Sequence, residues 1–261
     1  MLLSALRHSR CGLGRGLGVG VSSLQGVTPP MPPDRLPEGD EKRAAVREMF
    51  DTIAPRYDLV NRLMTFRLDV GIRRQTLESL NLAPGSIVLD LACGTGDFVK
   101  ALEKKGHRAI GVDLSYGMMA NAGFDGRFVQ GDLLSLPIAD RSVDAAVCGY
   151  ALRNLVALPA FFDELVRVVK SGGRIALVDV SAPEQKLLRM GYDVHFNKVV
   201  PFIGGLLSDR NAYAYLPRSV TYLPPPTEML QMMADAGLRN PARRQLTLGI
   251  AQLLTAERGV D

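Results

Sequence analysis

Apolar residues follow two alternating spacings along this chain, and the alternation predicts an α/β protein. Between residues 86 and 180, short β-rich apolar runs alternate with segments whose apolar residues recur every three or four positions. The first kind is typical of buried strands and the second of helices packed on a sheet, so we predict a parallel sheet covered on both faces. The predicted strands are Ser86–Leu91, Ala109–Asp113, Arg127–Gln130, Val143–Gly149 and Arg174–Val180, and the predicted helices between them are Phe98–Lys105, Met118–Ala122 and Pro159–Val169.

Helical segments flank this alternating core on both sides. Before it, a charged stretch predicts two short helices separated by Pro55 and a third helix over Asp69–Leu80. We interpret residues 40–80 as a helical lid. After the core, residues 181–226 are rich in Tyr, Pro and Gly and form a predicted substrate cap with helical pieces.

The chain closes with a predicted helix, Thr227–Ala236, and two predicted strands. The strands, Arg243–Thr247 and Ile250–Thr255, lie on either side of Leu248-Gly249, which indicates a hairpin. An α/β core that ends in an antiparallel hairpin resembles the class I methyltransferases. The resemblance implies a Rossmann-like domain with a seven-stranded sheet over residues 38–261.

Residues 1–37 differ from the rest in composition. Glycine stands at every second position from Gly12 to Gly20, and a Pro-rich stretch follows. Such a segment cannot bury a helical face, so we predict a disordered leader or tail. Translation that starts at Met31 rather than Met1, or an Arg-bearing and acid-free organellar presequence, are the alternatives that stay open.

Charge and cysteine content exclude several classes of protein. The chain has 31 basic and 27 acidic residues, but residues 1–33 hold three arginines and no acid, so the folded part is almost neutral. A nucleic-acid-binding domain would concentrate positive charge there, and we expect no nucleic acid as partner. No apolar run approaches the roughly 20 residues of a membrane-spanning helix. Three scattered cysteines suit neither a disulfide framework nor a zinc site, and we expect no metal.

The stretch "VLDLACGTGDF", Val88 to Phe98, carries the first functional signal. A buried strand ends near Asp90, and Gly94 and Gly96 follow in the turn into a helix. This arrangement lets the backbone approach a ligand at the carboxyl edge of the sheet. The dinucleotide fingerprint needs a third glycine where this chain has Val99, which disfavours an NAD protein.

Further carboxylates stand at the ends of the following strands. Asp113 ends the next strand, where a carboxylate can accept hydrogen bonds from both hydroxyls of a ribose. Asp132 follows the third strand, and Asp144 opens the fourth. An acid followed by Gly-X-Gly resembles the S-adenosylmethionine loop. The resemblance implies that this cofactor is held by Asp90, Gly94, Thr95, Gly96, Asp113, Asp132 and Leu133, with Asp132 on the adenine amino group.

Three longer motifs are more specific. "YALRN" at Tyr150–Asn154, "IAPRYDLVNRLMTF" at Ile53–Phe66 and "YAYLPRSVTYLPPPTEMLQMMADAGL" at Tyr213–Leu238 together resemble the ubiquinone/menaquinone biosynthesis C-methyltransferases. The resemblance covers about residues 44–258, and the absence of long insertions is most similar to bacterial demethylmenaquinone methyltransferases. It implies methyl transfer from S-adenosylmethionine to a ring carbon of a prenylated quinol.

The chain departs from the family pattern at several positions. The family usually has His and Trp where this chain has Asp69 and Ile72, and Glu-Phe where it has Asp179-Val180. A Ser common in bacterial members is Gly149 here. Because the cofactor loop is intact, these departures bear on the identity of the quinone and not on the transfer chemistry.

The resemblance also implies catalytic roles. A ring carbon becomes nucleophilic once the adjacent hydroxyl loses its proton, and a guanidinium can stabilise the resulting phenolate. Arg153, with Asn154 and Tyr57, would do this. The structural alternatives are a salt bridge from Arg153 to Asp58 or Asp163, a helix cap at Asn154 and lid packing for Tyr57.

Other interpretations stay open. His195, the one histidine of the cap, is the alternative base. The substrate could instead be ubiquinone-type or a secondary metabolite, and the chain could be a non-catalytic cofactor-binding scaffold. Peripheral membrane contact through the N-terminal helices and a homodimer are further partners to consider. We expect a cytoplasmic protein, at times on the inner face of the membrane, or a mitochondrial matrix protein if the leader is a presequence.

Overall fold

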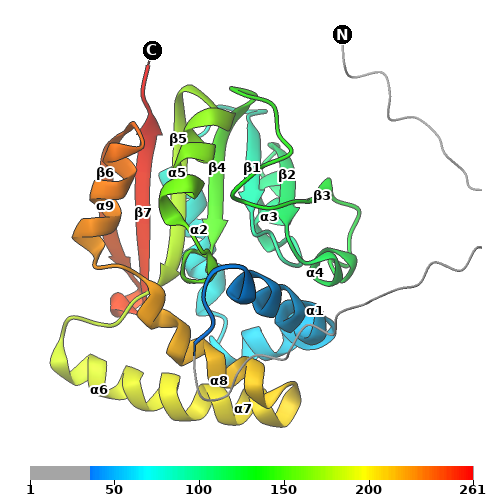
Figure 1. Cartoon of the computed structure of the whole chain (residues 1–261), viewed down its shortest axis with the longest axis vertical. Helices are drawn as coiled ribbons and strands as arrows, with labels where there is room; N and C mark the ends of the chain where they lie inside the picture. The colour runs from blue at the N-terminus through cyan, green and yellow to red at the C-terminus, as the bar shows by residue number, and fades with distance from the viewer. Residues whose placement is uncertain (1–35, 261) are drawn as a thin grey trace, which may run out of the picture.

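The computed structural model describes residues 36–260, which fold around one seven-stranded mixed sheet (Figure 1). The strand order is β3-β2-β1-β4-β5-β7-β6, in which β7 is antiparallel to both of its neighbours. This topology confirms the predicted fold class. The strands are β1 (Ile87–Leu91), β2 (Arg108–Asp113), β3 (Phe128–Gln130), β4 (Val143–Gly149), β5 (Val169–Val180), β6 (Leu238–Leu246) and β7 (Ala251–Arg258).

Helices cover both faces of the sheet, as the nearly continuous apolar strands require. On one face lie α2 (Leu68–Ser79), α3 (Asp97–Lys104) and α4 (Tyr116–Ala120), where Val99 and Leu102 pack against Val88 and Val147. On the other face lie α5 (Leu158–Val168) and α9 (Pro226–Asp235).

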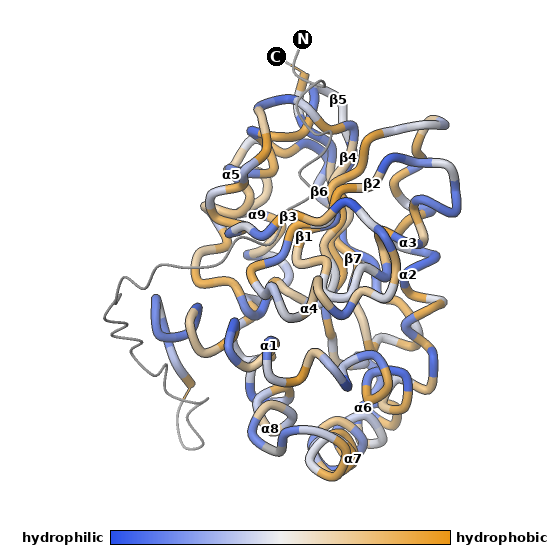
Figure 2. The backbone as a smooth tube through the Cα atoms, turned by 90° about the vertical axis from the view of Figure 1, so that its right-hand side faces the viewer, coloured by the Kyte–Doolittle hydropathy of each residue, from blue (hydrophilic) through white to orange (hydrophobic). Residues whose placement is uncertain are grey.

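A further layer of helices lies at the carboxyl ends of the parallel strands (Figures 1 and 2). Its buried residues form a core of their own, in which Met49 and Ile53 pack with Tyr213 and Tyr215. None of the helices among the described residues is long and apolar enough to cross a membrane. The layer comprises α1 (Gly39–Met64), α6 (Lys186–Val194), the π-helical turn η2 (His195–Val199), α7 (Val200–Leu207), α8 (Arg210–Ser219) and η3 (Val220–Tyr222).

The prediction of two short helices separated by Pro55 is wrong, because α1 runs through this proline without a break. Proline removes one intrahelical hydrogen bond, the one that its N–H would donate to Asp51. Pro55 is exposed, and α1 is held along its length by α4 and α7. Tertiary packing therefore outweighs the local cost of the proline.

The two ends of the described chain also bear on the prediction. Residues 1–35 of the predicted leader lie outside the described residues, whereas Leu36 packs against the α1 core and the Pro37 carbonyl accepts a hydrogen bond from Tyr222. The C-terminal hairpin is present with longer strands than predicted. Its turn is η4 (Thr247–Gly249), in which Thr247 and Leu248 have positive φ.

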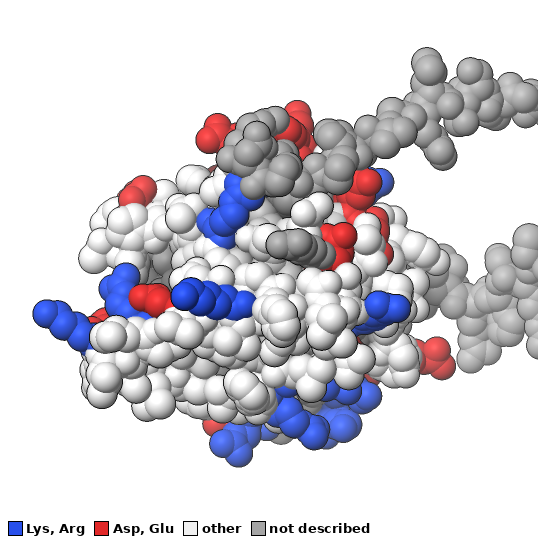
Figure 3. Space-filling view, turned by 90° about the horizontal axis from the view of Figure 1, so that it is seen from below, with Lys and Arg blue, Asp and Glu red and all other residues white. Residues whose placement is uncertain are grey.

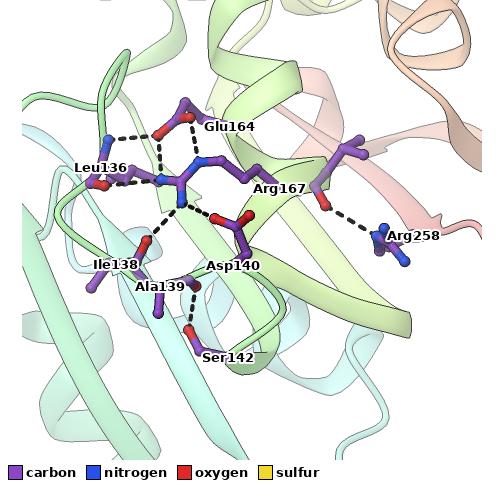
Figure 4. A network of polar contacts seen from close by, with 9 residues as sticks. Leu136, Ile138, Ala139, Asp140, Ser142, Glu164, Arg167 and Arg258 are labelled. Carbon is purple, nitrogen blue, oxygen red and sulfur yellow. Dashed lines mark hydrogen bonds and ion pairs between the residues drawn. The ribbon is translucent and has the colours of Figure 1, made fainter.

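An arginine-centred network fixes the loop between β3 and β4 (Figure 4). Arg167 of α5 binds both carboxylate oxygens of Glu164, at 2.7 and 2.8 Å, and Asp140 at 2.6 Å. It also donates to the carbonyls of Leu136 and Ile138, at 2.9 and 2.8 Å. A guanidinium with this many fixed acceptors holds the loop in one conformation. The same loop carries Asp132 and Leu133 into the site described next.

Candidate functional site

The turn after β1 is built for close approach of a ligand to the backbone. Gly94 and Gly96 have φ of +56° and +82°, the left-handed region that favours glycine. A Cβ on Gly96 would stand 2.7 Å from the ring of Phe128, so no side chain fits there. Gly96 therefore packs against a ring of the protein itself, while Gly94 lines the first cavity described below.

Asp113 ties this turn to the end of β2. Its Oδ2 accepts from the Gly94 N–H at 2.8 Å and its Oδ1 from the Ser115 N–H at 2.8 Å. Burial raises the pKa of this carboxyl, and the two N–H donors oppose that rise. Each oxygen retains a lone pair that can accept from a ligand hydroxyl.

Asp90 lies beneath the turn and is buried. Its Oδ2 accepts from the Val99 N–H at 3.3 Å, while Oδ1 has no hydrogen-bond partner among residues 36–260. Burial raises the pKa of Asp90 well above its usual range. A buried carboxylate with an unsatisfied oxygen favours a cationic or hydrogen-donating ligand beside it.

Asp132 and Thr95 are engaged by helix α1. Arg43 forms an ion pair with Asp132 at 2.5 Å, and the Thr95 hydroxyl donates to Asp58 at 2.7 Å. Asp132 also accepts from the Leu134 N–H at 3.0 Å. Helix α1 therefore closes over the carboxyl edge of the sheet.

A first cavity lies between α1 and the ends of the first four strands. Asp113 and Asp132 provide its polar wall, and Met118, Leu133 and Phe50 provide apolar surface. Among the residues predicted from the sequence, this cavity is lined by Gly94, Asp113, Asp132, Leu133, Tyr57 and Asn154. Asp90, Thr95 and Gly96 lie behind this lining and shape the turn.

A second cavity of about 480 Å³ lies under the helical layer. Its walls are mostly apolar, with contributions from Ile72 of α2 and Phe196 and Val200 of the cap. Arg153, His195 and Asp69 line it together with four tyrosines. Such a space suits a large apolar group attached to a polar ring.

Two tyrosines connect the cavities, because Tyr57 and Tyr150 line both of them. Burial raises the pKa of Tyr57, and the nearby charge of Arg153 opposes that rise. Both phenols therefore stay protonated at neutral pH and can donate hydrogen bonds at the junction.

Arg153 is buried and forms an ion pair with Asp179 at 2.5 Å. It also donates to the Tyr150 carbonyl at 2.7 Å and to the Ser219 hydroxyl at 3.2 Å. Burial lowers the pKa of Arg153, but Asp179 more than offsets this and holds it above its ordinary value. The alternative prediction of a salt bridge from Arg153 to Asp58 or Asp163 is therefore wrong, because the partner is Asp179.

Asn154 lines the first cavity and His195 lines the second. The Asn154 Oδ1 accepts from the Tyr215 hydroxyl at 3.2 Å and is not a helix cap. The Nε2 of His195 lies 3.1 Å from the Met64 carbonyl. A neutral His195 that donates this bond carries its proton on Nε2, which leaves Nδ1 as the basic nitrogen.

Comparison with known proteins assigns this arrangement to a family. The model of the ubiE/COQ5 methyltransferase family matches residues 38–258. The chain belongs to the ubiE/COQ5 methyltransferase family. A demethylmenaquinone methyltransferase of Roseiflexus castenholzii is 40% identical over 84% of this chain and 96% of its own length. The ubiquinone/menaquinone biosynthesis C-methyltransferase UbiE of Geobacter sulfurreducens is 36% identical over 84% of this chain and 91% of its own.

Solved structures support the fold of this methyltransferase. An S-adenosylmethionine-dependent methyltransferase from Aquifex aeolicus aligns with a TM-score of 0.54 at 18% identity, over 76% of this chain and 92% of its own. Geranyl diphosphate C-methyltransferase from Streptomyces coelicolor aligns with a TM-score of 0.52 at 18% identity, over 74% and 80%. At these identities the likeness concerns the fold alone.

S-adenosylmethionine is the cofactor of this methyltransferase, and the first cavity fits it. Gly94 lines this cavity, Asp113 has free lone pairs, and Asp90 has an unsatisfied buried oxygen. A cation beside Asp90 would offset the burial that raises the pKa of this carboxyl, and S-adenosylmethionine is cationic at its sulfonium and ammonium groups. No cluster of three or more metal-ligating side chains occurs in the part of the chain that the structure describes.

The structure also separates one residue from the others. Asp144, which the sequence places at the start of the fourth strand, lies at the opposite edge of the sheet from Asp90, Asp113 and Asp132. It accepts from the Ile87 N–H at 2.7 Å and pairs with Lys170 at 2.6 Å. It opens β4 instead of ending it, so the parallel strands carry it away from the site.

Sequence reasoning missed the partners that complete the site. Asp179 was noted only as a departure from the family pattern, although a lone acid in the apolar run "ALVDV" signals a buried cationic partner. Arg43 and Phe50 of α1 also belong to the site, but no feature of the sequence around them indicates this role. Asp69, another departure, is buried on the second cavity and accepts from Thr65 and Arg73.

Proposed function

We propose that this protein transfers a methyl group from S-adenosylmethionine to a ring carbon of a reduced, prenylated naphthoquinone, the quinol form of demethylmenaquinone. The observation that carries the proposal is the junction of the two cavities. The first cavity, in which Asp113 and Asp132 provide polar groups for the cofactor, meets a 480 Å³ apolar cavity at Tyr57 and Tyr150, and Arg153 lies on the side of the apolar cavity. The names of the relatives support the substrate class.

The chemistry requires a carbon nucleophile on the substrate. Loss of the proton from one quinol hydroxyl gives a phenolate, which places electron density on the neighbouring ring carbon. S-adenosylmethionine, when bound, supplies the methyl as an electrophilic carbon on a sulfonium sulfur. The ring carbon forms its bond to the methyl group as the carbon–sulfur bond breaks, which leaves S-adenosylhomocysteine. The ring carbon then loses its proton, the oxygen regains one, and the aromatic quinol is restored with one proton released overall.

Arg153 stabilises the phenolate through directed donors more than through net charge, because Asp179 neutralises the pair. Its Nη1 and Nε are engaged by protein acceptors, and Nη2 has no acceptor within residues 36–260. Nη2 is therefore the donor that a substrate oxygen can use. The protonated Tyr57 and the amide of Asn154 lie on the cofactor side and orient the ring or a bridging water.

The test compares reduced and oxidised demethylmenaquinone as substrates of the purified protein. The quinol should accept a methyl group, whereas the quinone should be inert because it has no hydroxyl to ionise. His195→Ala serves as the matched variant, since this histidine also lines the apolar cavity. Methylation of the quinone at the same rate as the quinol would refute the mechanism. Complete loss of activity in His195→Ala would indicate that His195, in the cap, is the base that removes the proton.

A further inference from the structure

Helix α6 has none of the buried residues that normally hold a helix in place. Leu187, Met190 and Val194 are 81%, 68% and 55% exposed, and their spacing puts them on one side of the helix. A helix with a fully exposed apolar stripe is unusual in a protein surrounded only by water.

The stripe continues into α7 because of the π-helical turn η2. A π-turn inserts one extra residue, which rotates the following positions by about 100° relative to an uninterrupted α-helix. Phe202 and Leu206 are thereby brought into line with the α6 residues, and they are 73% and 74% exposed. We call Leu187, Met190, Val194, Phe202 and Leu206 the outer stripe.

The opposite side of the same helices forms the roof of the apolar cavity. Leu188, Tyr192 and Phe196 line the cavity on this side. Other exposed apolar residues, Phe66 and Leu248, belong to the lining as well and are 72% and 75% exposed. The outer stripe is therefore continuous, through Leu187, with the apolar mouth of the cavity.

The charges beside the outer stripe are mostly positive. Lys186, Arg189 and Lys198 are exposed on the same helical run, with Asp193 as its one acid. Figure 3 shows the end of the molecule formed by these helices as a broad, largely uncharged face, with Lys and Arg on it and at its edges and Asp and Glu toward its periphery. This pattern is complementary to an apolar layer with anionic headgroups above it.

We propose that the outer stripe docks on the surface of a lipid bilayer that contains anionic lipids, with the mouth of the apolar cavity turned toward the acyl chains. This placement rests on the proposed function, because a prenylated quinol resides in the bilayer and its tail could then enter the cavity without crossing water. The sequence suggested membrane contact through the N-terminal helices, whereas the stripe lies on α6 and α7.

The test is flotation of the full chain with vesicles of phosphatidylcholine mixed with phosphatidylglycerol, compared with phosphatidylcholine alone. The variant is Met190→Ser/Phe202→Ser/Leu206→Ser, because none of these three lines either cavity. Loss of three large apolar contacts should lower the vesicle-bound fraction at least about tenfold. Val260→Ser is the control, since Val260 is 62% exposed near the C-terminus, at the other end of the molecule (Figure 1).

Two further measurements separate the outcomes. Methyl transfer to a short-tailed, water-soluble quinol should be unchanged in the triple variant, while transfer to a long-tailed quinol held in vesicles should fall. Flotation of the triple variant at the wild-type level, or a wild-type protein that stays unbound, overturns the docking proposal even if methyl transfer is normal. If the outer stripe instead binds a second copy of this chain, sedimentation should show a dimer of the wild type and a monomer of the triple variant. That result would also overturn the docking proposal.

Discussion

Replacement of Arg153 by alanine should damage the fold as well as the reaction. The side chains of Arg153 and Asp179 are 6% and 0% exposed, so the substitution leaves a carboxylate buried without its cation. Among residues 36–260, the donors that Asp179 would retain are the N–H of Val180 at 2.7 Å and that of residue 153 at 3.3 Å. Breaking one side of a buried pair costs about 3–5 kcal/mol, and the lost bonds to Tyr150 and Ser219 belong to that cost.

A double-mutant cycle separates the structural part from the catalytic part. We expect Arg153→Ala and Asp179→Ala each to lose about 3–5 kcal/mol of unfolding free energy, and the double variant to lose at least about 2 kcal/mol less than their sum. The measurement is urea unfolding of the four proteins at one pH.

Activity then decides the role of Arg153. If its donors stabilise the phenolate, the double variant should stay at least about 100-fold slower on the quinol than wild type even where it is fully folded. Additive losses of stability would contradict the buried pair. Recovery of near wild-type turnover in the folded double variant would show that Arg153 only supports the structure.

Three other substitutions test the cofactor turn and a buried lysine of α1. Asp113→Ala should weaken binding of S-adenosylhomocysteine by about 2–4 kcal/mol in calorimetry, and equal affinity would reject the ribose contact. Gly96→Ala should lower the melting temperature and cofactor affinity together, because a left-handed φ and the Phe128 ring oppose a Cβ. Burial lowers the pKa of Lys42 to about 8 from 10.5, so the unfolded chain binds more protons between these values. Stability should therefore rise with pH from 8 to 10 by about 1–2 kcal/mol relative to Lys42→Met, and parallel profiles in urea unfolding would contradict this.

Local patterns in the sequence determined the core of this protein. The alternation of strands and helices, the glycine turn and Asp113 at the end of β2 were all predictable because each depends on neighbours within a few residues. Residues at the carboxyl ends of parallel strands meet at one edge, which is why Asp90, Asp113 and Asp132 come together. The motif around Arg153 and Asn154 indicated the family because a short, specific motif can be identified without knowing which distant residues it contacts.

Only the tertiary structure decided which partners these residues have. Asp179 reaches Arg153 across 26 residues and Arg43 reaches Asp132 across a longer stretch of chain, and no periodicity encodes such pairs. The local sequence around Pro55 predicts a break in the helix, yet α1 is continuous because it packs against α4 and α7. The outer stripe depends on the extra residue of a π-turn, which changes the rotation of everything after it. Each of these features arises from contacts between elements that are distant in sequence. The free energy of such contacts exceeds the intrinsic helix and turn propensities on which a prediction from sequence rests.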